Sequence, residues 1–334
     1  MGAAGAAISM FGLGDGRTAH AEDALLSLDA ISPAALNSTG IKVLANASRI
    51  AVPSYRFGVV MRSGVAASGG QGSVQMEASA DLVGVSLEQM REIADAAYAD
   101  FIARLGQIGR EVVPAAEMKA SAGYAKLEMT EVPLVKKPFA DARTVVMVSP
   151  NGMPLVNQHS DSPITDKSPF SLGNWRAINQ MCVDLGCVTM IPSVVIDFAQ
   201  LSGSGHSVYG TSAKVGITPG LYLVPLFTQL SAHHAKIALA GPSGKIILKK
   251  RVAIGQAGEL VHTSSYNNRT EVDWWNSIGR WDANASPLSK PGQAYDYSTY
   301  QYRVDPGLFA QACADGASAM NGIYVDAAAA NRPG

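Results

Sequence analysis

One unit, an apolar strand followed by a helix and a second apolar strand, occurs twice in this chain. The first copy comprises Arg49–Val52, Ser86–Leu105 and Arg110–Val113. The second comprises Val145–Val148, Leu172–Leu185 and Cys187–Phe198. Helices that alternate with apolar strands are typical of folds in which helices cover a sheet. The repetition therefore predicts an α/β (α+β) core, a mixed sheet with amphipathic helices packed on it.

The helices carry the clearest local signals. Ser86 and Gln89 form a capping box, in which the Gln89 side chain reaches back to Ser86. The first apolar stripe follows at helical spacing: Leu87, Met90, Ile93, Ala97, Phe101 and Leu105. A third helix, over residues 304–326, begins at Asp305-Pro306 and is expected to pack on the core. Its apolar stripe is predicted to comprise Leu308, Ala312, Gly316, Met320 and Ile323. We expect Phe101 and Ile178, one from each of the first two helices, to be buried.

Between residues 187 and 255 the pattern changes to sheet, and residues 22–255 are predicted to form the core domain. Val188–Ala199 is rich in β-branched residues, and Pro192 within it suggests an edge or a bulge. The sequence predicts a flexible turn over Leu201–Tyr209 and an antiparallel hairpin around Gly241–Gly244. Further strands are expected at Lys214–Ile217, Leu221–Leu230 and Lys236–Ala240.

Residues 1–21 match the pattern of a secretory signal peptide. The apolar run Gly2–Leu13 precedes Ala19-His20-Ala21, a small-x-small pattern that signal peptidase cleaves. No Lys or Arg precedes the run, so an ordinary N-terminal tail is the alternative. No run reaches the ~20 apolar residues that a transmembrane helix needs. The expected location is therefore periplasmic, outer-membrane-associated or extracellular.

Aromatic residues are concentrated in residues 256–303, a stretch also rich in Asn, Ser, Gly and Pro. It holds three of the chain's four tryptophans and five of its eleven tyrosines. The composition predicts an irregular segment whose rings form a protein interface or stack on a sugar. The alternative is that the rings fasten the segment to the domain. The candidate contact residues are Trp274, Trp275, Trp281, Tyr295, Tyr297 and Tyr300.

The chain carries no recognised catalytic or metal-binding motif. Gly203–Ser207 lacks the spacing of a nucleophile elbow, and Gly244-Lys245 lacks the other residues of a phosphate loop. His233 and His234 are adjacent on an expected strand and point to opposite faces, so they do not chelate one metal together. The sequence therefore predicts no catalytic residue, metal or cofactor. The sequence leaves open whether Cys182 and Cys187 form a disulfide.

Charged residues make up only 16% of the chain, against about a quarter in ordinary domains. The net charge is −1 and no basic stripe is visible, which argues against a nucleic-acid partner. Low charge is typical of a protein that buries surface against copies of itself. The alternative explanation is a solvated surface made of uncharged polar residues. We expect a homo-oligomer.

Three segments carry a resemblance to a group of envelope proteins. "RIAVPSY" (49–55) resembles the opening strand of that group, and "FIARLGQIGREVVP" (101–114) resembles its step from helix to strand. "AINQMCVDLGCVTMIPSVVIDF" (177–198) resembles its helix, glycine and buried strand. On these residues the chain resembles the superfamily that includes the curli-secretion channel lipoprotein and the N-terminal domain of TolB. It also looks like uncharacterised secreted bacterial proteins. The resemblance implies a non-enzymatic envelope role, often as an oligomer.

Three function classes follow from the sequence. The first is a non-enzymatic structural or assembly protein of the bacterial envelope or exterior, which associates with itself or another envelope protein. The second is a glycan- or peptidoglycan-binding module that uses the aromatic segment. The third is an enzyme of unrecognised type.

Overall fold

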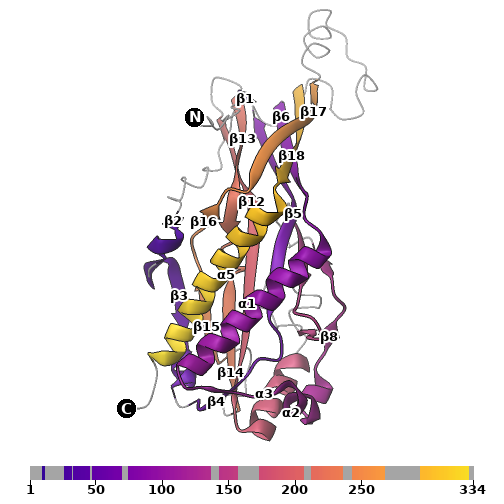
Figure 1. Ribbon diagram of the computed structural model, residues 1–334. Coiled ribbons are helices and arrows are strands. Elements are labelled where there is room, and N and C mark those ends of the chain that lie inside the picture. Colours follow the sequence, from indigo (N-terminus) through magenta and orange to yellow (C-terminus); the bar gives the residue numbers. More distant parts are fainter. Residues whose placement is uncertain are drawn as a thin grey trace, which may run out of the picture.

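The computed structural model is an elongated α+β fold (Figure 1). It describes residues 10–11, 26–31, 33–45, 47–69, 74–136, 143–156, 173–206, 212–235, 243–267 and 294–330. The α-helices are α1 (Leu87–Gln107), α2 (Ala115–Ala120), α3 (Gly173–Leu185) and α5 (Pro306–Ala329). Short 3-10 helices lie at Leu28–Ala30, Pro33–Ala35, Ile41–Leu44 and Tyr124–Lys126. The strands are β1 (Met10–Phe11), β2 (Leu26–Ser27), β3 (Leu36–Thr39), β4 (Arg49–Ala51), β5 (Arg56–Gly69), β6 (Val74–Val83), β7 (Glu111–Val112), β8 (Met129–Thr130), β9 (Leu134–Lys136), β10 (Thr144–Val148), β11 (Leu155–Val156), β12 (Val188–His206), β13 (Ser212–Leu223), β14 (Gln229–His234), β15 (Gly244–Leu248), β16 (Val252–Gly255), β17 (Gly258–Asn267) and β18 (Ala294–Val304).

Most of the strands belong to one mixed sheet, whose main path runs β17-β18-β6-β5-β12-β13-β16-β2. Strands β4 and β5 both run parallel to β12, and β18 runs parallel to β6. Strand β13 lies close to β6 although two strands separate them along the path, so the sheet is curled. The prediction of a mixed sheet that carries helices is confirmed at this level.

Helices α1 and α5 pack against each other beside the sheet (Figure 1). The Asn321 Nδ2 atom in α5 donates a 2.8 Å hydrogen bond to the Ala97 carbonyl in α1. Phe101 in α1 is fully buried and Ile178 in α3 is 1% exposed, as predicted. Asp305 caps α5 by accepting a hydrogen bond from the Leu308 N–H, which confirms the predicted start of that helix.

The predicted capping box of α1 is half right. The Ser86 hydroxyl accepts a hydrogen bond from the Gln89 N–H at 3.1 Å. The Gln89 side chain does not reach back to Ser86 but donates to the Pro306 carbonyl. The beginning of α5 lies next to the beginning of α1, so this side chain joins two helices.

The predicted repeat is wrong as a pair of equivalent units. In the first unit, the β5–β6 hairpin is inserted between the strand β4 and the helix α1, and β4 then pairs in parallel with β7. In the second unit, β10 and β12 do not pair with each other. Both pair with β5, at opposite edges, with Phe57 opposite Val148 on one side and Val194 on the other.

Two predicted irregular segments contain strands. The expected turn over Leu201–Tyr209 is wrong for its first half, because β12 continues to His206 and pairs with β13 there. The segment 256–303 is not irregular at its ends, which form β17 and β18 in the main sheet. The partner strands impose an extended backbone on these polar stretches. The expected strand Lys236–Ala240 lies outside the described residues.

Pro192 lies in the central strand β12, at a local gap and not at an outer edge. Strand β4 pairs with Val188 and Thr189 of β12, and β5 takes over at Ser193. Pro192 therefore faces the interval between them, where no N–H donor is needed on that side.

The structure has three buried free cysteines, Cys182, Cys187 and Cys313, among its described residues. No described helix has the length and apolar character to cross a membrane.

Candidate interface at the sheet edge

The β17–β18 hairpin ends the main sheet on one side. Strand β18 pairs with β6 along ten residues, from Ala294 opposite Val74 to Arg303 opposite Val83. Strand β17 then pairs with β18 and, among the described strands, with β18 alone. The free edge of β17 therefore carries backbone N–H and C=O groups that can pair with another strand.

Alternate residues of β18 point to opposite faces of the sheet, as in any strand. Ser298, Tyr300 and Tyr302 are buried inside the curled sheet. The Tyr302 ring stacks on Phe198 of β12 at 6.0 Å between centroids, and its hydroxyl accepts a hydrogen bond from the Ala257 N–H. These contacts fasten the hairpin to the core.

Of the six candidate contact residues, Tyr297 and Tyr300 are the two whose side chains the structure describes. Tyr300 is 5% exposed and lies in edge contact with the His262 ring, so it packs within this chain. Tyr297 is half-buried, and its hydroxyl shares a 3.1 Å hydrogen bond with Ser79 of β6. The backbone of Tyr295 lies in β18, opposite Gln75, and its side chain is outside the described residues. Trp274, Trp275 and Trp281 also lie outside them.

The edge of β17 is interrupted by one bulge but carries neither lysine nor proline. Natural edge strands are blunted by lysine, proline or bulges. The ten residues of β17 contain one acid, Glu259, and neither Lys nor Pro. A bulge at Thr263 interrupts the register with β18. Beyond it, Ser264, Ser265 and Tyr266 are all exposed, with Tyr266 opposite Tyr297. The end of this strand is therefore polar, almost uncharged and open to a partner.

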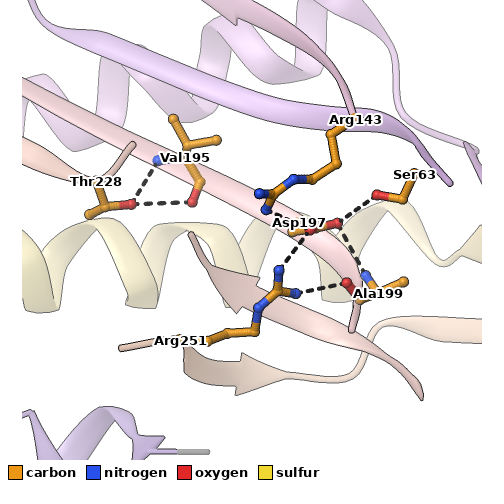
Figure 2. A network of polar contacts seen from close by, with 7 residues as sticks. All are labelled: Ser63, Arg143, Val195, Asp197, Ala199, Thr228 and Arg251. Carbon is orange, nitrogen blue, oxygen red and sulfur yellow. Dashed lines mark hydrogen bonds and ion pairs between the residues drawn. The ribbon is translucent and has the colours of Figure 1, made fainter. Parts of the chain in front are cut away.

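A buried ion cluster supports the strands from which the long hairpins extend (Figure 2). Asp197 of β12 is 1% exposed and sits where the register with β13 shifts. Its Oδ2 atom faces Nη1 of Arg143 at 3.4 Å and Nη2 of Arg251 at 3.2 Å. Its Oδ1 atom accepts hydrogen bonds from the Ser63 hydroxyl and the Ala199 N–H, each 3.3 Å long.

The two arginines of the cluster are also held by other groups. Arg251 donates a 2.7 Å hydrogen bond from Nη1 to the Ala199 carbonyl and lies over the Tyr222 ring. Arg143 lies over the Phe227 ring at 5.2 Å. Through these four contacts Asp197 joins β5 and β12 to the arginines just before β10 and β16. Both of its carboxylate oxygens are occupied by these contacts, so Asp197 is not placed as a catalytic base. This cluster was not predicted, although one sequence signal exists: Asp197 is the only charged residue of Val188–Ala199.

No known protein family matches this chain, and searches among curated proteins and solved structures also give no match.

Proposed function

We propose that this protein is a non-enzymatic structural or assembly protein of the bacterial envelope or exterior, and that it associates with copies of itself through the β17–β18 hairpin. The observation that carries the proposal is the free edge of β17, a ten-residue strand with one charged side chain. Strands of this kind bind partners by adding a strand to the sheet. The low charge of the whole chain also reduces repulsion between copies.

The β17–β18 hairpin is already folded before any contact between copies of the chain forms. The inner face of β18 is anchored by Tyr300 and Tyr302, so the hairpin does not need a partner to hold its shape. A preformed strand loses little conformational entropy when it pairs, which favours association. Trp274, Trp275 and Trp281 lie between β17 and β18 in the sequence, and they add contact area in this proposal.

We expect a lysine on the β17 edge to dissociate the assembly. In Ser265→Lys, each copy places an ammonium group on the pairing edge, where pairing would desolvate it and bring like charges together. Light scattering of the wild-type chain should give the mass of a defined oligomer, and the variant should give the mass of one chain. The matched control is Ser48→Lys, an exposed serine just before β4, near the opposite end of the molecule (Figure 1).

A second variant tests the tryptophans of the hairpin. Replacing Trp274, Trp275 and Trp281 together by serine should also reduce the mass while leaving the circular dichroism spectrum unchanged. A triple variant that unfolds would show that the rings are internal packing. A wild-type chain that is monomeric, or Ser265→Lys and triple variants that both remain assembled, would contradict the proposal.

The compartment in this proposal rests on Ala19-His20-Ala21 and on the resemblance to envelope proteins. We expect the protein to be exported and cleaved after Ala21. Mass spectrometry of the natively expressed protein checks this, and a mature chain that begins at Glu22 is the expected result. An intact Met1 on protein recovered from the cytoplasm would refute export.

A further inference from the structure

A pocket of about 180 Å³ lies far from the β17 edge, where β4 ends. The chain leaves the sheet after Ala51 and rejoins it at Arg56, and helices α1 and α2 close over this gap together with the turn between β10 and β11. The lining includes Asp95, Tyr98, Met118, Lys119, Tyr124 and Met153, together with proline rings. It thus combines aromatic and aliphatic walls with a few polar groups, as small-molecule sites do.

The wall formed by the β10–β11 turn is held rigidly by hydrogen bonds. The two carboxylate oxygens of Asp95 accept hydrogen bonds from the backbone N–H and the side-chain amide of Asn151, at 2.7 and 2.6 Å. Gly152 has φ +72°, a left-handed backbone that closes the turn. The Ser54 hydroxyl donates a 2.9 Å hydrogen bond to the Pro154 carbonyl. A ligand therefore meets a preformed wall, which reduces the entropy lost on binding.

The polar groups of the pocket suit a ligand rich in hydroxyls. The hydroxyls of Tyr98 and Tyr124 make no hydrogen bond with any described residue. Burial raises the pKa of both phenols, so they stay protonated and can donate at neutral pH. The Asp95 carboxylate keeps lone pairs beyond the two that Asn151 uses, and the Lys119 ammonium adds donors.

The volume limits the ligand to about one ring. A cavity of roughly 150 Å³ in another protein holds one benzene molecule. We propose that this pocket binds one sugar ring, such as a terminal pyranose of a glycan. The C–H face of a pyranose packs on tyrosine and proline rings, while its hydroxyls bond with Asp95, Lys119 and the two phenols. A small aromatic ligand would use the walls but would leave the polar groups without partners.

Methionine methyl groups allow binding to be observed directly. The full chain labelled with ¹³C-methyl methionine is titrated with methyl glucoside, with N-acetylglucosamine and with phenol. The signals of Met118 and Met153, assigned with the Met118→Leu and Met153→Leu variants, should shift and saturate with a sugar. Methionines distant from the pocket should not shift.

The Tyr98→Phe and Tyr124→Phe variants test the hydroxyl contacts. Each keeps the ring and removes one hydrogen-bonding group, so each should weaken sugar binding roughly three- to tenfold. Tyr222→Phe, in β13 and outside the pocket, is the matched control and should bind as the wild type does. The proposal is overturned if neither methyl signal responds to a sugar, if only phenol shifts them, or if both tyrosine variants bind sugar with unchanged affinity.

Discussion

Replacing Phe101 by alanine should destabilise the protein by about 3–5 kcal/mol. Phe101 is fully buried in α1, and its ring lies 6.1 Å from that of Tyr55, whose hydroxyl donates a hydrogen bond to Asn321 of α5. The substitution removes a fully buried ring that packs on Tyr55 and leaves a cavity in the core beside α1. Urea unfolding of wild type and variant measures the loss.

The control for this substitution is Leu308→Ala in α5. Leu308 is 58% exposed, although its spacing predicted it to lie in the buried stripe of that helix. Its truncation should change the free energy of unfolding by no more than about 0.5 kcal/mol. A loss below about 1 kcal/mol for Phe101→Ala would mean that the α1 face described above is not the packed one.

Asp197→Asn should cost about 3–5 kcal/mol, because it removes the buried carboxylate charge that two partly buried guanidinium groups share. The amide of asparagine has nearly the same shape as the carboxylate, so the loss reports charge and hydrogen bonding and not volume. Adding Arg251→Met should recover part of the loss, since one uncompensated charge is then removed. Urea unfolding of the single and double variants measures both effects.

An exposed ion pair on the neighbouring strands provides the comparison. Arg62 of β5 and Asp81 of β6 lie 2.8 Å apart, with 55% and 41% of their side chains exposed. Asp81→Asn should change stability by less than about 1 kcal/mol. Equal effects at Asp81 and Asp197 would contradict the anchoring role given to the buried cluster.

Elements specified by local sequence were the ones that could be predicted. Helix α1 carries its own cap at Ser86 and its own apolar spacing, and α5 carries Asp305-Pro306, so neither depends on distant residues for recognition. Strand β4 and the first half of β12 are apolar enough to be identified alone. The Leu308 error shows the limit of spacing, because the stripe includes a position that the fold leaves exposed.

The long hairpins were not predicted, and much of their strand structure depends on distant partners. Beyond Arg62, β5 consists largely of Gly, Ala and Ser, without a strong alternation of apolar residues. Strand β6 does alternate apolar and polar residues from Val74 to Leu82, a local strand signal that was missed. Strand β6 is extended between β5 and β18, and its partners in β18 lie more than two hundred residues further along the chain.

The ion cluster and the pocket depend on the fold in the same way. The two arginines that face Asp197 each lie 54 positions away in sequence, one on either side. The pocket combines residues from Val52 to Pro154. The aromatic segment was recognised by composition, but only the fold separates the packed ring of Tyr300 from the half-buried ring of Tyr297.

Hydrogen–deuterium exchange of β17 is the most direct test of the central claim, that copies of this chain associate through its edge. Peptides covering Gly258–Asn267 are followed in the wild-type protein at high and low concentration, with peptides from α1 as the internal reference. The account predicts that exchange in β17 slows at high concentration while α1 is unchanged, and that Ser265→Lys abolishes the difference. Exchange in β17 that is independent of concentration, in a sample that light scattering shows to be assembled, would contradict it.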